Sequence, residues 1–225
     1  MDSNEQIISD FNEIAELGDE PKWNHNNCYY GELLRLLPPP QADVCLDIGY
    51  GKGELACMLS VRASEVVAVD ISDKMIEYAE RINAAPNINY VRSDIFDADI
   101  KDCSLDAIVT AATAHHLSLS RLFEFSKVKL KPGGRLIILD LAKPSSLTDY
   151  ILWGFAIFPN IVMNILKNGR LHKDDPHTAA LWRINAEHDV YMTIAEVKGL
   201  ARRHLNGAKV SRKLYWRYML VWSKP

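Results

Sequence analysis

The chain has 225 residues, of which 48% are hydrophobic and 24% charged, and its net charge is −3. This length and balance are typical of one folded domain that buries a full core without disulfides or metal ions. An acidic net charge excludes the overall basic field of a nucleic-acid-binding protein, so no nucleic-acid partner is expected. The four cysteines lie far apart without a CxxC pair, so the sequence predicts neither a disulfide framework nor a metal site.

The first ten residues are polar and acidic, so we expect no signal peptide and a cytoplasmic protein. We also expect a monomer or a homodimer. The segment 150–166 is apolar and needs comparison with membrane spans. It is short for a span and contains Pro159, Asn160 and Asn164. We therefore predict a buried or lid helix pair broken at Pro159 rather than stable membrane insertion, with contact at a membrane surface as the alternative.

Strands and helices are expected to alternate after an N-terminal helical segment that ends at the prolines 38–40. Apolar runs and helical spacing predict, in chain order, a strand at 44–48, a helix at 53–61, a strand at 66–70, a helix capped by Ser72, strands at 88–92 and 105–110, a helix at 118–130, a turn at 131–134 and a strand at 135–141. Such alternation predicts a parallel sheet with helices on both faces.

The remaining third of the chain departs from this alternation. Residues 143–191 are long and irregular, and they include the polar run GRLHKDDPHT. A helix is predicted at 193–205, with Thr193 as its cap and Glu196 in the capping-box position. Strand-like runs at 208–213 and 217–223 are separated by a few residues, so they are expected to pair as an antiparallel hairpin.

Glycines are concentrated where the first strand meets the following helix. Residues 47–53 read DIGYGKG, and Asp70 ends the next strand. Glycines allow a ligand to approach the backbone closely. A carboxylate at the end of the second strand can accept hydrogen bonds from both ribose hydroxyls. The pattern predicts a cofactor that contains a nucleoside, and a tight turn without a ligand is the alternative for the loop alone.

Two details distinguish this loop from the loops that bind dinucleotides. Its spacing is GxGxG and not the GxGxxG that seats a pyrophosphate on a helix N-terminus. Asp47 precedes the loop, where its carboxylate would repel phosphate and attract a ligand with an ammonium and a sulfonium group. S-adenosylmethionine carries both cations and has no phosphate.

Between residues 44 and 141 the sequence resembles the class I S-adenosylmethionine-dependent methyltransferases of small-molecule type, especially those related to quinone biosynthesis. Five segments carry the resemblance in the family's order: VCLDIGYGKGE, VVAVDISDKMIEYAE, YVRSDIF, LDAIVTAATAHHL and LKPGGRLIILD. The resemblance implies an α/β, Rossmann-like fold with a seven-stranded sheet, mostly parallel with an antiparallel terminal hairpin. It implies that the chain is an enzyme whose cofactor is S-adenosylmethionine.

The resemblance also implies which residues hold the cofactor. Asp70 would bind the ribose, Met75 would lie near the adenine, and Asp94 and Ile95 would meet its amino group and its ring. The complete set expected at the cofactor is Asp47, Gly49, Gly51, Gly53, Asp70, Ile71, Met75, Asp94, Ile95 and Ala111.

The crevice between the first and fourth strands is where ligands of such sheets bind. Methyl transfer is a direct displacement, so the main task of an enzyme is to align the reactants and exclude water. His115 and His116, just after the fourth strand, are candidate general bases, with acceptor positioning or simple packing as alternatives. His177 is a third catalytic candidate. His188 and Asp189 could act as a base and its orienter, but sequence neighbours point apart, so a surface position is expected for each.

Aromatic residues predict where an acceptor would bind. Trp23, Tyr29, Tyr30 and Trp153 are expected to line an acceptor pocket, with core packing as the alternative. The chain is thus expected to divide into an N-terminal helical cap (1–40), a cofactor-binding core (41–142), an inserted lid over the acceptor (143–191) and a segment that completes the core (192–225).

The predicted function is methyl transfer to a small-molecule acceptor, with apolar compounds and secondary metabolites among the candidates. One alternative is an enzyme that cyclises or cleaves S-adenosylmethionine without methylating anything. Another is a non-catalytic cofactor-binding module, which the five complete segments argue against. A nucleic-acid methyltransferase is disfavoured by the charge and by the absence of an NPPY-type motif.

Overall fold

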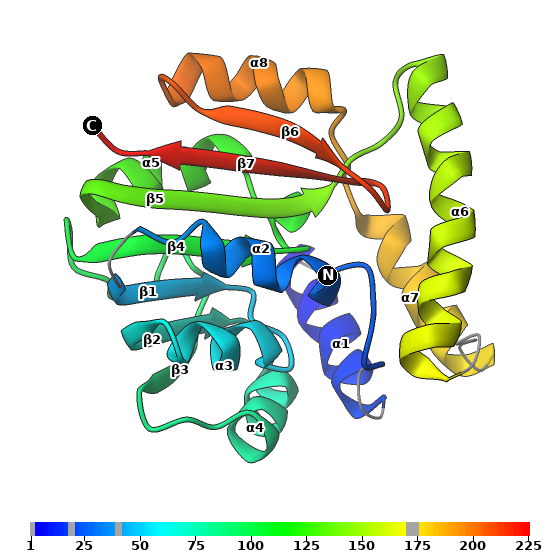
Figure 1. The fold of residues 1–225 in the computed structure, drawn as a ribbon. Helices are drawn as coiled ribbons and strands as arrows, with labels where there is room; N and C mark the ends of the chain where they lie inside the picture. The colour runs from blue at the N-terminus through cyan, green and yellow to red at the C-terminus, as the bar shows by residue number, and fades with distance from the viewer. Residues whose placement is uncertain (1–2, 18–20, 39–41, 170–175) are drawn as a thin grey trace.

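The computed structural model describes residues 3–17, 21–38, 42–169 and 176–225 (Figure 1). Within them, seven strands form one sheet in the order β3-β2-β1-β4-β5-β7-β6. The strands are β1 (Ala42–Ile48), β2 (Ala63–Asp70), β3 (Ile88–Arg92), β4 (Leu105–Ala111), β5 (Leu130–Leu141), β6 (Lys209–Lys213) and β7 (Arg217–Ser223). Strands β1 to β5 are parallel, and β7 runs antiparallel to both β5 and β6. The predicted seven-stranded Rossmann-like sheet with its antiparallel hairpin is confirmed.

Helices cover both faces of this sheet (Figure 1). They are α1 (Ser3–Glu16), α2 (Tyr30–Arg35), α3 (Glu54–Ser60), α4 (Asp73–Ile82), α5 (Leu119–Lys129), α6 (Leu147–Asn168), α7 (Pro176–His188) and α8 (Ile194–His204), with short 3-10 turns η1 (Asn27–Tyr29) and η2 (Ala114–His116). The helices α1, α6 and α7 lie at the edge of the sheet where β1 and β4 end, which is the right-hand side of Figure 1.

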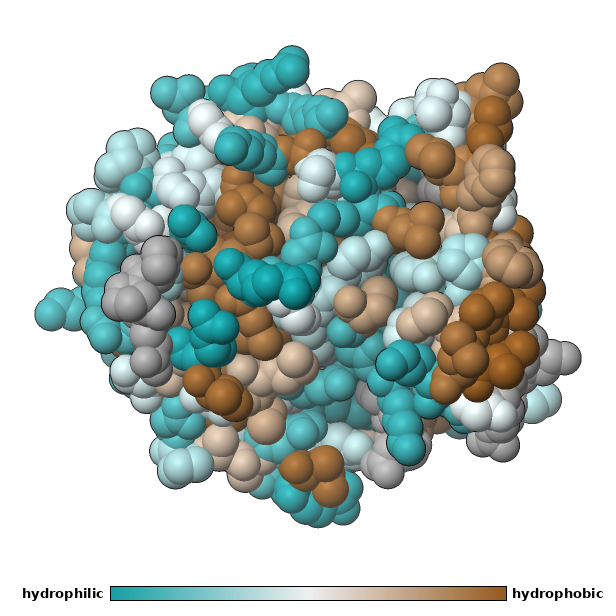
Figure 2. All heavy atoms as spheres, in the orientation of Figure 1, coloured by the Kyte–Doolittle hydropathy of each residue, from teal (hydrophilic) through white to brown (hydrophobic). Residues whose placement is uncertain are grey.

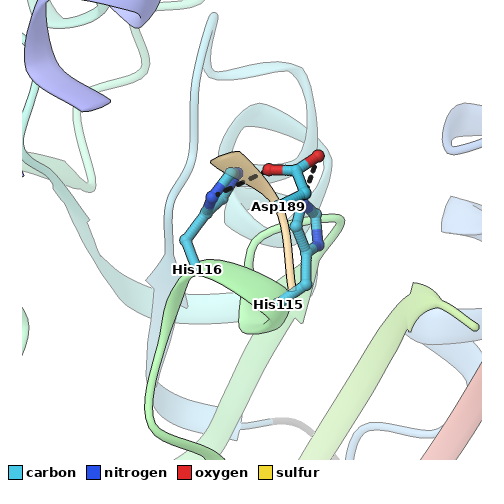
Figure 3. Close-up of side chains that lie close together, drawn as sticks. All are labelled: His115, His116 and Asp189. Carbon is cyan, nitrogen blue, oxygen red and sulfur yellow. Dashed lines mark ion pairs between the residues drawn. The ribbon is translucent and has the colours of Figure 1, made fainter. Parts of the chain in front are cut away.

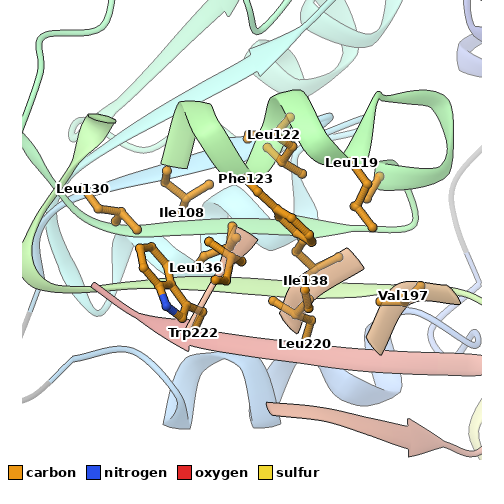
Figure 4. Packing of buried hydrophobic residues seen from close by; sticks show 14 of the residues in the cluster. Ile108, Leu119, Leu122, Phe123, Leu130, Leu136, Ile138, Val197, Leu220 and Trp222 are labelled. Atoms are coloured by element: carbon orange, nitrogen blue, oxygen red, sulfur yellow. The ribbon is translucent and has the colours of Figure 1, made fainter. Parts of the chain in front are cut away.

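The alternation of side chains along each strand builds two cores. In β5, Leu136 and Ile138 face the cluster that includes Phe123 of α5, whereas Ile137 faces the cluster that includes Leu59 of α3. Figure 4 shows the first cluster, with Phe123 packed between α5 and the strands. Burying each of these side chains contributes about 1.5–3 kcal/mol, so the two cores hold the strand ends firmly in place.

Two predicted helix caps are present. The Ser72 hydroxyl accepts a hydrogen bond from the Met75 amide over 3.1 Å and begins α4. At α8, the Thr193 hydroxyl accepts from the Glu196 amide while the Glu196 carboxylate accepts from the Thr193 amide. Such caps each contribute about 1 kcal/mol.

The turn predicted at 131–134 was wrong, because these residues belong to β5. Leu130 pairs with Leu105 and Arg135 with Ala107, so the extra residues form an irregularity in the strand. The Gly133 amide donates to the Lys224 carbonyl, and the Lys224 amide donates to the Gly134 carbonyl. Backbone pairing with the end of the chain, which a local sequence pattern cannot show, therefore keeps this segment in the sheet.

The helix break predicted at Pro159 was also wrong, because α6 is one helix of 22 residues. A proline inside a helix removes one backbone donor. Hydrogen-bonded caps at both ends of α6 stabilise the helix and offset this loss. Ser146 and Asp149 form a capping box, and Gly169 ends the helix in a left-handed conformation with φ 72°.

Most apolar side chains of α6 are exposed rather than buried. Phe155 and Phe158 are 71% and 74% exposed, and Figure 2 shows the hydrophobic patch that α6 forms at the right-hand edge of the molecule. Among the described residues, α6 is the one helix whose length and composition would suffice to cross a membrane, and 12% of its apolar window is buried. Such a single helix is weak evidence for a membrane span.

Candidate active site

A cavity of about 370 Å³ opens where the strands end. Its walls come from the loops after β1, β2 and β4, from α1, from α7 and from the start of β7. The sheet order places β2 on one side of β1 and β4 on the other, so the chain changes direction at β1. The cavity therefore lies at the topological switch point, where open α/β sheets bind their ligands.

In the loop after β1, glycine is favoured at three positions for different structural reasons. Gly49 has φ +68°, and a side chain there would collide with Thr113 in the loop after β4. Gly51 has φ +53°, and a Cβ atom there would meet nothing within 4 Å, so its backbone is open to a ligand. Gly53 has φ +83°, and a Cβ atom there would lie 2.8 Å from that of Ala79. Gly49 and Gly51 line the cavity, whereas Gly53 serves the packing of α3 against α4.

The Asp70 carboxylate lies at the end of β2 and lines the cavity. Its Oδ2 accepts a hydrogen bond from the Gly51 amide over 2.9 Å, and its Oδ1 accepts from the Ser72 amide over 3.0 Å. Burial raises the pKa of Asp70, against the opposing effect of these hydrogen bonds. Each carboxylate oxygen can accept a further hydrogen bond, which is what the two hydroxyls of a ribose would donate.

The other residues predicted at the cofactor are also found around this cavity. Its lining includes Ile71, Met75, Asp94, Ile95 and Ala111. Ile95 and Met75 are buried, and so provide apolar surface on which a base could pack. The geometry thus brings together eight of the ten residues predicted for the cofactor, and leaves out Gly53 and Asp47.

The Asp47 side chain is buried, with 1% of the residue exposed. It does not belong to the described lining of the cavity, and its direct contact with the cofactor stays a prediction. Its Oδ2 has no hydrogen-bond partner among the described residues. Burial, with a smaller contribution from the charge of Asp70, raises the pKa of Asp47 to about 8. A positively charged ligand nearby would lower this cost, so Asp47 can act on a cofactor through its charge.

Beyond β4, the backbone turns sharply to place two histidines at the cavity. Ala112 adopts φ 55°, an unusual conformation for a residue with a side chain, and its amide donates to the Leu139 carbonyl over 2.8 Å. The turn η2 follows and carries His115 and His116, which both line the cavity. Backbone strain of this kind is often found where side chains must be positioned for function.

Asp189, which follows α7, approaches both histidines (Figure 3). Nε2 of His115 lies 3.7 Å from Oδ2 of Asp189, and Nδ1 of His116 lies 3.3 Å from Oδ1. We call these three residues the histidine cluster. Their side chains are 6%, 9% and 5% exposed, and all three line the cavity. The expectation that Asp189 lies at the surface was wrong, because the chain folds back after α7 and carries it inward.

Two further residues hold the histidine cluster. Nδ1 of His115 lies 2.6 Å from Oδ1 of Asp140 on β5, and the Tyr191 hydroxyl donates to Oδ2 of Asp189. Burial lowers the pKa of His115, but the hydrogen bond to Asp140 and the nearby carboxylates outweigh it, so the pKa is raised. The pKa of His116 is lowered by burial and by the adjacent His115. The arrangement leaves Nε2 of His115 able to accept a proton or bind a cation.

The remaining predicted residues lie in several places. His177 is exposed at the start of α7 and outside the described lining of the cavity. Trp23 is buried and packs edge-on against Tyr215 with ring centroids 5.4 Å apart, and the Tyr29 hydroxyl donates to the Leu214 carbonyl over 3.1 Å. Neither belongs to the described lining, whereas Tyr30 does. The side chain of Trp153 lies outside the described part of the structure.

Several cavity residues were not predicted. On α1, the lining residues Ile7, Phe11 and Ile14 recur at helical spacing, a signal that the sequence carried. Trp182 on α7 had no such signal, because its segment is predominantly polar. Arg217 is buried at the start of β7, where Nε donates to the Asn26 side chain over 2.9 Å.

Comparison with known proteins shows the family to which the chain belongs. A model of the methyltransferase domain matches residues 46–138. A methyltransferase of Mycobacterium tuberculosis is 30% identical over 219 residues, which cover 92% of this chain and 99% of the relative. The chain belongs to the class I S-adenosylmethionine-dependent methyltransferases. This methyltransferase therefore uses S-adenosylmethionine as its cofactor, as predicted.

Other similarities extend over the length of this methyltransferase. A demethylmenaquinone methyltransferase of Clavibacter sepedonicus is 24% identical over 206 residues, covering 89% of this chain and 81% of the relative. The solved structure of an S-adenosylmethionine-dependent methyltransferase of Aquifex aeolicus superposes with a TM-score of 0.60 at 19% identity, covering 96% of this chain and 98% of that one. The latter similarity establishes the fold.

Proposed function

We propose that this enzyme transfers the methyl group of S-adenosylmethionine to a small-molecule acceptor that binds against the histidine cluster. One observation carries the proposal: the Asp70 carboxylate and the histidine cluster line the same cavity. Since β1 lies between β2 and β4, Asp70 and the cluster approach the glycine loop from opposite sides. A ligand held by its ribose at Asp70 can thus extend over the loop towards the histidines.

On the cofactor side, the chain supplies hydrogen-bond acceptors, apolar surface and an open backbone. Asp70 would accept from the ribose hydroxyls, Met75 and Ile95 would pack against the adenine, and Gly51 would allow close approach. When bound, the cofactor supplies an electrophilic methyl group on a good leaving group. The task of the protein is therefore to align the acceptor with that methyl group and to exclude water.

On the acceptor side, the cavity combines apolar walls with a few polar groups. Phe11 of α1 and Trp182 of α7 line it, together with Arg217 and Tyr191. Pockets of this composition bind small organic molecules, with the polar groups fixing their orientation. The relative named as a demethylmenaquinone methyltransferase supports an acceptor of this kind. The net charge of −3 argues against a nucleic-acid acceptor.

The proposal is tested by incubating the enzyme with S-adenosylmethionine labelled in its methyl group, with and without a panel of phenols, quinols and carboxylic acids. We expect labelled product and S-adenosylhomocysteine to accumulate together, and only when an acceptor is present. Consumption of the cofactor without an acceptor would contradict methyl transfer and favour cyclisation or cleavage of the cofactor. Cofactor binding without any turnover, across acceptors that fit the cavity, would favour a non-catalytic module.

A further inference from the structure

We propose that His115, His116 and Asp189 form a site for a divalent transition-metal ion, which holds an oxygen atom of the acceptor. The role of the ion in catalysis rests on the proposed function, whereas the binding of the ion can be measured without it. All three residues line the cavity, so an ion bound to them would face the acceptor.

The distances within the histidine cluster suit such an ion. One potential ligand atom from each residue can be chosen so that all lie within 4.8 Å of one another. The two histidine–carboxylate distances are 3.7 Å, from His115 to Oδ2 of Asp189, and 3.3 Å, from His116 to Oδ1. An ion with tetrahedral ligands at about 2.0–2.2 Å holds its ligand atoms roughly 3.3–3.6 Å apart. Closing a separation of up to 4.8 Å to this range takes a relative shift of about 1.2–1.5 Å between two ligand atoms. Small side-chain rotations supply such a shift, and the side chains in Figure 3 already converge.

The surroundings of the cluster have the features of a metal site. Asp140 accepts the Nδ1 hydrogen of His115, which directs Nε2 of that ring towards Asp189. Metal-bound histidines commonly donate their other ring N–H to a carboxylate in this way. Tyr191 fixes one oxygen of Asp189.

The environment of Asp189 is a separate observation that favours a bound cation. Oδ1 of Asp189 is buried and has no hydrogen-bond partner among the described residues, although Nδ1 of His116 lies 3.3 Å away. A buried carboxylate oxygen without a partner costs free energy, and an ion beside it would offset that cost. Two imidazole nitrogens with one carboxylate favour zinc, manganese, iron, cobalt or nickel over calcium and magnesium.

Three protein ligands leave room for a ligand from the cavity, as in catalytic zinc sites. An acceptor hydroxyl bound to the ion would release its proton to water more readily. Its oxygen would then form a bond to the methyl carbon while the carbon–sulfur bond breaks and sulfur keeps the electron pair. In this arrangement His115 and His116 are ligands, so the ion takes the place of the predicted general base.

The experiment is a calorimetric titration of metal-free protein with Zn²⁺, and separately with Co²⁺, in the absence of cofactor and acceptor. We expect one ion per chain. The substitutions His116→Gln and Asp189→Asn each remove one ligand and should weaken binding at least about 100-fold, and Asp140→Asn should weaken it about 10- to 100-fold. The controls are His204→Gln, at a half-buried histidine that pairs with Glu124, and Cys103→Ser, at an exposed thiol. Both should bind as the wild type does.

Circular dichroism and melting curves would establish that each variant is folded, and the visible spectrum of bound Co²⁺ gives a second readout of its ligands. Absence of stoichiometric binding by the wild type would overturn the proposal. Equal affinity in folded His116→Gln and Asp189→Asn proteins would also overturn it. Assay of the metal-free protein with S-adenosylmethionine and acceptor separates the two proposals. Methyl transfer without any metal would overturn the role of the ion in catalysis and leave the proposed function standing.

Discussion

Nδ1 of His115 lies 2.6 Å from Oδ1 of Asp140, and the two side chains are only 6% and 2% exposed. This contact joins the loop after β4 to the adjacent strand β5. A carboxylate at this distance fixes both the tautomer and the orientation of an imidazole, because Nδ1 must carry the shared hydrogen. The rigid centre of the sheet thereby sets where the other nitrogen of His115 points.

Replacement of Asp140 should change the proton affinity of that histidine. We expect Asp140→Asn to lower the pKa of His115, because the hydrogen bond and the charge of Asp140 raise it against the effect of burial. A titration of the histidine ring protons by nuclear magnetic resonance measures this directly. The ring protons of His204, which pairs with Glu124 on α5, serve as the control. An unchanged pKa for His115 would mean that Asp140 does not hold the imidazolium.

Asp70→Ala should weaken the binding of S-adenosylmethionine by about 1.5–3 kcal/mol, the range for hydrogen bonds to a charged group. The reason is that its carboxylate is the one positioned for the ribose at the end of β2. Calorimetry of the variant and of Glu77→Ala, which removes an exposed carboxylate on α4, provides the comparison. Equal affinities for the two variants would contradict the ribose assignment.

Gly51→Val should abolish cofactor binding and leave the protein folded. Its backbone has φ +53°, and the space beside it is open to the cavity. The matched control is Gly207→Val, because Gly207 has φ +79° and a Cβ atom there also meets nothing within 4 Å. Both variants carry a similar backbone strain of about 1–2 kcal/mol, so only a lost ligand site distinguishes them. Normal cofactor binding by folded Gly51→Val protein would show that the loop is only a turn.

Asp47 should make the stability of the cofactor-free enzyme depend on pH. Its pKa is raised from 3.8 to about 8, so the folded protein holds a proton that the unfolded chain releases. Asp47 therefore does not reduce the free energy of unfolding below about pH 4. Between about pH 4 and pH 8 it lowers that free energy by up to about 1.4 kcal/mol per pH unit. Asp47→Asn should remove this slope. Urea denaturation of both proteins between pH 5 and 8 measures the difference, and parallel curves would contradict the buried, unpaired state of Asp47.

The central sheet was predictable because its information is local. Buried parallel strands appear in the sequence as short apolar runs. Ser72 and Thr193 are N-cap residues that mark the starts of α4 and α8. That the residues proposed for the cofactor line one cavity was predictable for the same reason, because they follow consecutive strands whose ends meet at one edge of the sheet. Gly53 shows the limit: a glycine can be required by helix packing as well as by a ligand.

The acceptor side could not be predicted in the same way, because long-range packing builds it. Asp189 has no local pattern that would direct it to His115 and His116, and it reaches them only through the path of α6 and α7. His177 belongs to the same segment, yet it lies exposed at the far end of α7. The position of a polar residue within such a segment depends on how the segment docks on the core, which the residue's own sequence neighbours do not encode.

A crystal structure of the enzyme with S-adenosylhomocysteine tests the account most directly. We expect both ribose hydroxyls to donate to the Asp70 carboxylate. We also expect the chain carrying the sulfur to pass Gly51, so that the sulfur faces the histidine cluster. The position of the missing methyl group would then lie between the sulfur and His115, His116 and Asp189. A ribose bound away from Asp70, or a sulfur that faces away from the cluster, would contradict it.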